Sequence, residues 1–160
     1  HRTYDIDVVI TNCSNNYGPH QHREKFIPTV IESILNHRNI PVYGNGKNIR
    51  DWLYVQDHVT ALDIVFHQGV NGQTYNIGAN NELSNIEVVH SICDILEKKG
   101  VCKNPRDLIT FVADRLGHDQ RYAIDFTKLK NELHWDPEFD FPEGLSITID
   151  WYINNIMSSI

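Results

Sequence analysis

Polar and cationic side chains stand at the ends of several expected strands and helices. Asn15 and Asn16 follow the first expected strand, and Lys25 precedes the first expected helix. Similar positions farther along the chain are held by Arg50, Asn85, Arg115 and His118. Each residue alone is typical of a solvated or capping side chain. Together they are the parts of an anion site, because Arg presents a fixed fork of donors to phosphate oxygens and Asn donates to them. Tyr43 is placed to stack on a base.

A short segment with two glycines carries two patterns that occur in nicotinamide-dependent enzymes. Gly44 and Gly46 match the first glycines of a dinucleotide-binding loop, but Ile49 stands where the third is required. Tyr43 and Lys47 have the spacing that places a catalytic pair on one face of a helix. Two glycines inside that interval disfavour a helix, so we expect a hairpin turn and assign neither pattern a catalytic role.

Metal and hydrolase chemistry have less support in the sequence. His20 and His22 lie near Cys13, but no third ligand follows at a defined spacing, and we interpret the histidines as an exposed pair. No Gly-x-Ser-x-Gly motif marks a nucleophilic serine. The three cysteines, Cys13, Cys93 and Cys102, have no Cys-x-x-Cys spacing and are expected to be reduced thiols.

Composition excludes several classes of protein. The chain has 160 residues, a formal charge of −7, 41% hydrophobic and 22% charged residues, which is typical of a single folded domain. Lys and Arg are not clustered, which argues against nucleic acid and anionic membranes as partners. No apolar run approaches the roughly 20 residues of a membrane helix, and no signal core opens the chain. We therefore expect a cytoplasmic protein.

Strands and helices alternate along the chain. Strands are predicted at residues 6–11, 41–43, 49–55, 73–78, 109–113 and 121–125, and the first is expected to be buried. Helices are predicted at residues 26–37, 56–67, 86–99 (with Asn85 as N-cap), 127–134 and 142–157. The strands at 41–43 and 49–55 are expected to form a hairpin. This order predicts a mixed α/β domain with too few strand–helix–strand units for a complete dinucleotide fold.

Several motifs resemble those of one enzyme family over nearly the whole chain. Asn-Tyr-Gly-Pro occupies residues 16–19, Ile-Arg-Asp-Trp-Leu-Tyr-Val occupies 49–55, and Asp-Arg-x-Gly-His-Asp-x-Arg-Tyr occupies 114–122. The sequence thereby resembles the dTDP-glucose 4,6-dehydratases, lyases of the extended short-chain dehydrogenase/reductase family that act in bacterial deoxysugar synthesis. The first motif is shared by many nucleotide-sugar enzymes, whereas the other two are much more specific.

The resemblance implies a role for each residue of the anion site. Asn15 would contact the nucleotide-sugar substrate, Asn16 would lie against the NAD cofactor, and Arg50 and Arg115 would bind the diphosphate. The remaining implied substrate contacts are Lys25 and Phe26 at the nucleotide, Pro41 and Tyr43 at the base, and Asn85 and His118. In the family, NAD takes hydride from C4 of the sugar, water leaves across C5 and C6, and the hydride returns to C6.

The resemblance also implies what this chain would lack. The Gly-rich loop, the catalytic Tyr-x-x-x-Lys pair and the Asp-Glu pair for the elimination are expected before His1. We therefore expect residues 1–160 to be mostly the substrate-binding domain, with the last strand or strands of the Rossmann domain, and to hold no catalytic residue. The isolated chain is predicted to be inactive, and the parent enzyme is expected to be a homodimer.

Two other functions stay open. One is a sibling epimerase or decarboxylase that acts on a UDP-sugar, because the fold and the Asn-Tyr-Gly-Pro loop are shared. The motifs around Arg50 and Arg115 weigh against it. The other is a non-catalytic module that binds a nucleoside diphosphate.

Overall fold

The spacing of apolar side chains determines where the helices form. The structure is a computed structural model that describes residues 1–157. In α1 (Phe26–Leu35), buried residues recur every three or four positions, at Ile27, Val30, Ile31 and Ile34. The same pattern recurs in α3 (Asn85–Lys98). The other helices are α2 (Val55–Gln68), α4 (Thr127–Leu133), α5 (Phe141–Met157) and the 3-10 turn Pro105–Leu108.

The strands form three small sheets. β1 (Ile10–Cys13) pairs in parallel with β5 (Thr74–Ile77), and β3 (Ile40–Tyr43) pairs in parallel with β7 (Ile109–Val112). The third sheet is built around β4 (Ile49–Tyr54). That strand pairs in parallel with β2 (Asn15–Tyr17) and β8 (Arg121–Tyr122) and antiparallel with β6 (Glu82–Ser84).

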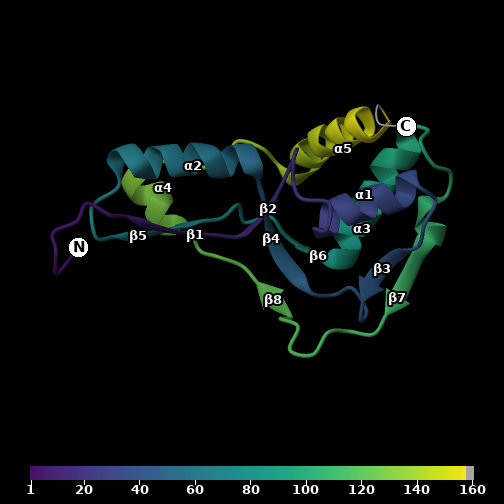
Figure 1. The fold of residues 1–160 in the computed structure, drawn as a ribbon, viewed down its shortest axis with the longest axis horizontal. Helices are drawn as coiled ribbons and strands as arrows, with labels where there is room; N and C mark the ends of the chain where they lie inside the picture. Colours follow the sequence, from purple (N-terminus) through teal and green to yellow (C-terminus); the bar gives the residue numbers. More distant parts are fainter. Residues whose placement is uncertain (158–160) are drawn as a thin grey trace.

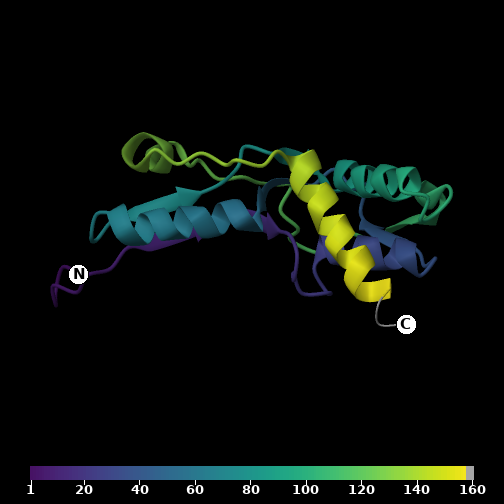
Figure 2. The same cartoon turned by 90° about the horizontal axis from the view of Figure 1, so that it is seen from above.

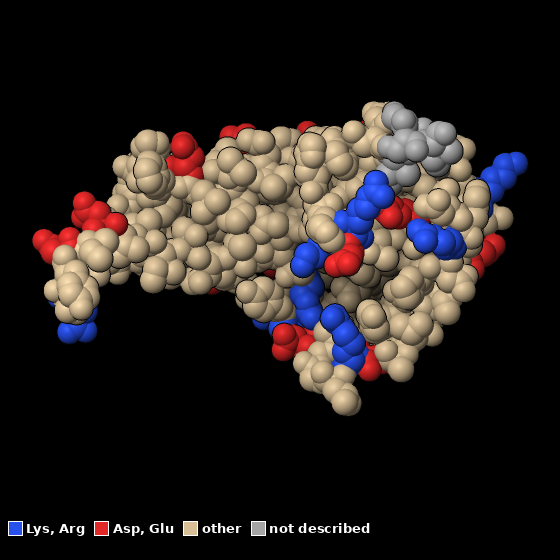
Figure 3. All heavy atoms as spheres, viewed as in Figure 1, with Lys and Arg blue, Asp and Glu red and all other residues tan. Residues whose placement is uncertain are grey.

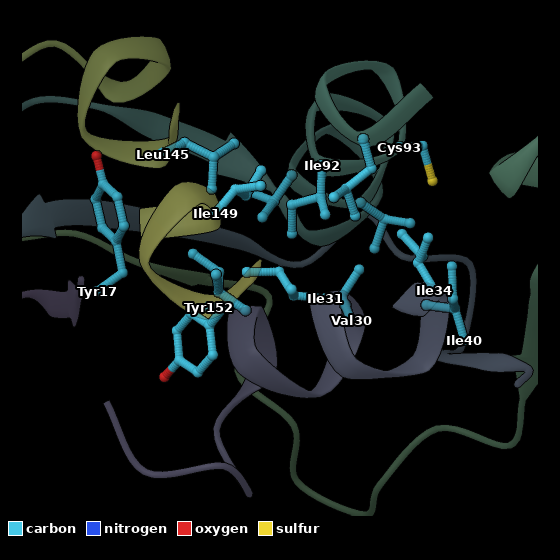
Figure 4. Close-up of a cluster of buried hydrophobic side chains, with 14 of the residues drawn as sticks. Tyr17, Val30, Ile31, Ile34, Ile40, Ile92, Cys93, Leu145, Ile149 and Tyr152 are labelled. Atoms are coloured by element: carbon cyan, nitrogen blue, oxygen red, sulfur yellow. The ribbon is translucent and has the colours of Figure 1, made fainter. Parts of the chain in front are cut away.

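The elements separate into two ends joined by β2 and β4. Figure 1 shows α2 and α4 with β1 and β5 at the end that carries the N-terminus, and α1, α3, β3 and β7 at the other end. Seen from above, α5 crosses beside α1 and α3 (Figure 2). The larger hydrophobic core lies between these three helices, and Figure 4 shows Ile31, Ile92, Ile149 and their neighbours meeting there. A second core around Leu53 and Tyr75 lies at the N-terminal end.

The mixed α/β class is confirmed, but four local predictions are wrong: the start of the first strand, the loop at Asn15 and Asn16, the N-cap of α3 and the pairing of β3 with β4. The first strand begins at Ile10 rather than residue 6, and Ile6 is 56% exposed because no described element covers that side of the segment. Asn15 and Asn16, expected in a loop, form β2 because they pair with Trp52 and Leu53 of β4. β6 and the 3-10 turn were not predicted.

The N-cap of α3 is Ser84 rather than Asn85. Ser84 Oγ accepts a hydrogen bond from Glu87 N (3.4 Å), and the Glu87 carboxylate accepts one from Ser84 N (2.8 Å). This reciprocal capping box satisfies two backbone donors at once, so the helix begins at Asn85 itself.

The strands expected to form a hairpin, β3 and β4, lie in different sheets. The turn between them closes as predicted, with Gly46 N donating to Tyr43 O (3.0 Å) and with positive φ at both glycines. The start of α3 then occupies the connection, because Ile86 N donates to Gly46 O (3.0 Å) and Asn85 N donates to Asn48 O (3.0 Å). A Cβ on Gly46 would lie 2.9 Å from Ile86 Cβ. The strands therefore separate and pair with other partners.

Candidate functional site

A cavity of about 670 Å³ opens beside β4 and gathers residues from segments far apart in the sequence. The structure brings all ten residues of the predicted site together in its lining: Asn15, Asn16, Lys25, Phe26, Pro41, Tyr43, Arg50, Asn85, Arg115 and His118. Their individual roles stay predictions. Four further lining residues were not predicted: Gln21, Glu24, Thr29 and Trp52.

The alternation of side chains along β4 separates the cavity from the supporting structure. Arg50 and Trp52 both line the cavity, while Asp51 between them is buried on the other face. Asp51 is 1% exposed and accepts hydrogen bonds from Ala79 N (3.1 Å) and Asn81 N (2.9 Å). This buried carboxylate thus fixes the turn that leads into β6 and Asn85.

Two backbone carbonyls hold the guanidinium of Arg50 in place. Its Nη1 donates to Ile49 O (2.7 Å), and its Nη2 donates to Asp119 O (2.9 Å). Asn48 Nδ2 donates to the same Asp119 oxygen (3.1 Å). Because a guanidinium carries five N–H donors, these two bonds orient Arg50 and leave other donors for an anion.

A second cationic group is built on the loop between β7 and β8. The guanidinium carbon of Arg115 lies 4.9 Å from the centroid of the Tyr43 ring, in cation–π geometry. Arg115 Nη2 is 3.3 Å from His118 Nε2, and His118 Nδ1 is 2.7 Å from Asp114 Oδ1. Since a guanidinium only donates, we assign the His118 proton to Nδ1, which donates to Asp114.

Hydrogen bonds from His118 and from the backbone N–H of Arg115 lower the pKa of Asp114. Gly44, which directly follows Tyr43, has φ of 56°, and a Cβ on it would lie 2.9 Å from Asp114 Oδ2. Gly44 therefore lets the turn after β3 approach this loop closely, which keeps Tyr43 next to Arg115.

The cavity has a cationic rim on an acidic protein. Lys25, the N-cap residue of α1, lines it together with Arg50 and Arg115, whereas Glu24 is the acidic residue of its lining. Figure 3 shows Lys and Arg side chains gathered around a hollow on the side of the molecule where β3, β7 and β8 lie. The arrangement favours an anionic ligand despite the net charge of −7.

The end of the cavity near β2 is held by amide groups. Asn16 Nδ2 donates to Ser14 O (3.0 Å), and Gln21 Nε2 donates to Asn16 O (2.7 Å). Gln21 O in turn accepts a hydrogen bond from Tyr152 on α5 (2.5 Å). The loop between β2 and α1 is thereby fixed on both sides.

The described side chains offer no cluster for the metal chemistry considered at His20 and His22. Within the described residues, no three His, Cys, Asp or Glu side chains are grouped so that they could hold a metal ion. The His20 ring packs on Trp151, with ring centroids 4.4 Å apart. No helix within residues 1–157 is long and apolar enough to span a membrane.

Sequence comparison assigns the chain to a family. Residues 1–148 match the family model described as GDP-mannose 4,6 dehydratase, so the chain belongs to that family. It is 50% identical over 158 residues to a dTDP-glucose 4,6-dehydratase of Xanthomonas campestris, covering 97% of this chain and 45% of that protein. It is 51% identical over 159 residues to one from Escherichia coli, covering 96% and 44%. The chain thus spans less than half the length of these relatives.

Solved structures agree with this assignment. The dTDP-glucose 4,6-dehydratase of Bacillus anthracis, solved in complex with NAD, is 46% identical with a TM-score of 0.88 and covers 98% of this chain and 48% of its own. The enzyme of Streptomyces venezuelae, solved with NAD and TYD bound, is 40% identical with a TM-score of 0.91, covering 99% and 47%. These matches confirm the predicted resemblance and the extended short-chain dehydrogenase fold. A UDP-glucose 4-epimerase of Thermotoga maritima, 24% identical with a TM-score of 0.86, shares the fold alone.

Of the lining residues that were missed, Trp52 had a signal in the sequence. It lies two positions after Arg50 on a predicted strand, and residues two apart on a strand point to the same face. Gln21, Glu24 and Thr29 carried no such signal, because they come from a loop and a helix start whose path the sequence leaves undetermined.

Proposed function

We propose that this chain is the substrate-binding part of a dTDP-glucose 4,6-dehydratase, a cytoplasmic and homodimeric enzyme that converts dTDP-glucose to dTDP-4-keto-6-deoxyglucose. The observation that carries the proposal is the meeting of Lys25, Arg50 and Arg115 with Tyr43 in one cavity. Three cations and an aromatic ring in one cavity suit a nucleoside diphosphate. The identities of 50% and 51% to dTDP-glucose 4,6-dehydratases support the choice of thymidine nucleotide and glucose.

NAD, when bound, would accept the hydride transiently in this reaction. Asn16 is the residue of this chain that we assign to the cofactor. Its Oδ1 is buried without a hydrogen-bond partner among the described residues, so the chemistry of the site fits a donor such as a carboxamide N–H. The bond from Asn16 Nδ2 to Ser14 O keeps that oxygen oriented.

Binding of dTDP tests the proposal directly. A ligand that binds only the folded chain stabilises it by about 2.7 kcal/mol at a hundredfold excess over Kd. We expect dTDP to raise the melting temperature of the 160-residue chain, and UDP to raise it less. Arg50→Ala should abolish the shift at the same concentration. Arg2→Ala is the matched control, since Arg2 is exposed near the N-terminus at the opposite end of the molecule (Figure 1).

The outcomes separate the proposal from its alternatives. A larger shift with UDP than with dTDP favours a UDP-sugar epimerase or decarboxylase. An unchanged dTDP shift in Arg50→Ala removes Arg50 from the phosphate site. The absence of a shift with either nucleotide rejects the proposed function.

Turnover is a separate part of the proposal. We expect the 160-residue chain, incubated with dTDP-glucose and NAD, to form no 4-keto product, because the lining of its cavity includes no residue to which we assign catalysis. Formation of that product would overturn this expectation. Binding of dTDP without turnover fits both the dehydratase part and a non-catalytic nucleoside-diphosphate module, and a preference for dTDP-glucose over dTDP favours the first.

A further inference from the structure

Besides Asn16, two residues that line the cavity, Trp52 and Gln21, have buried polar atoms without a hydrogen-bond partner among residues 1–157. Trp52 is 4% exposed, and its Nε1 is closed off from solvent. Gln21 uses its Nε2 for the bond to Asn16 O, whereas its Oε1 is buried and accepts no bond. A buried donor or acceptor without a partner is costly, and native proteins retain such groups where something else completes the bond.

Aromatic contacts hold the Trp52 indole in one orientation. The ring stacks on Phe26 with centroids 6.1 Å apart, and it meets Tyr17 edge-on at 6.4 Å. Phe141 of α5 closes a third side at 6.4 Å. Because these neighbours restrict rotation of the ring, the N–H is a preorganised donor, and an indole N–H can only donate.

The sheet places Trp52 between two residues of the proposed site. In the register of β2 and β4, Trp52 stands opposite Asn15, so their side chains leave the same face as neighbours. Arg50 lies two residues earlier on β4 and also lines the cavity. The indole therefore belongs to the region where the diphosphate group would give way to the sugar.

The chemistry of the unpartnered atoms discriminates between these two groups. Phosphate oxygens only accept hydrogen bonds, so the Gln21 oxygen would oppose them. A hydroxyl both donates and accepts, which suits the buried Trp52 donor and the buried Gln21 acceptor of two residues that line the same cavity. The geometry points to Trp52 as a substrate-binding residue that donates from Nε1 to a hydroxyl of the sugar, with Gln21 Oε1 as an acceptor in the same subsite. This inference rests on the proposed function and specifies its sugar subsite.

The test compares two ligands that differ only in the sugar. Dissociation constants of dTDP and dTDP-glucose are measured by calorimetry for the full chain and for Trp52→Phe, which keeps an aromatic ring and removes the N–H. We expect dTDP-glucose to bind about tenfold more weakly to the variant, or about 1.4 kcal/mol, while dTDP changes less than about twofold. Trp135→Phe is the matched control. Trp135 is 3% exposed, belongs to the second core and donates from Nε1 to Thr60 (3.2 Å).

A second measurement tests the inference without a substitution, in case Trp52→Phe fails to fold. In the unaltered chain, the indole ¹H–¹⁵N resonance of Trp52 should shift with dTDP-glucose more than with dTDP, while that of Trp135 stays in place. The inference is overturned if Trp52→Phe weakens both ligands equally, if it weakens neither, or if the Trp52 resonance responds equally to both. If the chain binds neither ligand, the proposed function fails and this inference fails with it; if dTDP binds and the sugar has no effect on Trp52, only the inference fails.

Discussion

The carboxylate of Asp51 is a buried structural group on the strand that lines the cavity. It is 1% exposed, and it accepts the backbone N–H groups of Ala79 at 3.1 Å and Asn81 at 2.9 Å. In Asp51→Asn, one oxygen becomes an NH₂ group, which faces a backbone N–H whichever way the amide is turned. An unpaired buried N–H costs about 1–3 kcal/mol, and loss of the charge weakens the remaining bond by about 1 kcal/mol. We expect the free energy of unfolding to fall by about 2–4 kcal/mol.

Urea denaturation followed by circular dichroism measures this loss. With a slope of about 2 kcal/mol/M, in the middle of the usual range for small proteins, the midpoint should fall by about 1–2 M. Asp94→Asn is the control, because Asp94 is 59% exposed and pairs with Arg106 at 2.7 Å on the surface. Such exposed pairs contribute about 0–1 kcal/mol. If Asp51→Asn loses no more stability than Asp94→Asn, the carboxylate does not hold the turn and the reasoning is refuted.

Further predictions concern the capping box and the cysteines. Ser84→Ala should lower the free energy of unfolding by about 1 kcal/mol in urea denaturation, because an N-cap is lost. Half-buried Ser91→Ala, which removes only a bond to the Glu87 carbonyl inside the helix, should change it much less, and equal effects would contradict the capping assignment. Hydrogen bonds from Ser84 lower the pKa of Glu87, so its contribution to stability is complete above the pKa of the unfolded state and is lost as pH falls through the lowered value. The difference between Ser84→Ala and the unaltered chain should therefore shrink in acid, and a constant difference would exclude Glu87. Burial raises the pKa of Cys93 to about 11, so little of its thiol is ionised at pH 8. Ellman's reagent should therefore modify half-buried Cys13 first and react with Cys93 only after the chain is unfolded in urea. Rapid labelling of Cys93 in the native chain would instead show that its helix opens.

The sequence predicts the helices well because their apolar spacing is local information. The helix expected at residues 26–37 ends at Leu35, and the one expected at 56–67 spans Val55–Gln68. Strand pairing is not local, since it depends on which edges remain available after the helices pack. This is why a short Gly-rich turn after Tyr43 was interpreted as a hairpin, although the start of α3 occupies that connection in the folded chain.

For the cavity too, the residues that local motifs mark were predicted, whereas the contacts between distant segments were not. The motifs identified Arg50 and Arg115 as cations of one site, although 65 residues separate them. The sequence did not predict that Asp119 O would accept a hydrogen bond from the Arg50 guanidinium. It also did not predict that the Arg115 guanidinium would lie over the Tyr43 ring. Each of these contacts joins a strand to the loop between β7 and β8, whose path is set by its anchors at both ends.

β4 explains why so many separate segments meet at one cavity. Its pairing with β2 brings Asn15 opposite Trp52, and its pairing with β6 sets the start of α3 and therefore Asn85. Its pairing with β8 closes the loop that carries Arg115 and His118. Because one short strand fixes three neighbours, a change on its buried face, such as Asp51→Asn, should displace several cavity walls together. A change on its cavity face, such as Trp52→Phe, keeps an aromatic ring in the larger core, removes the proposed donor to the sugar and leaves those backbone pairings intact. The two faces of β4 thus separate stability from binding, and substitutions one residue apart should divide accordingly.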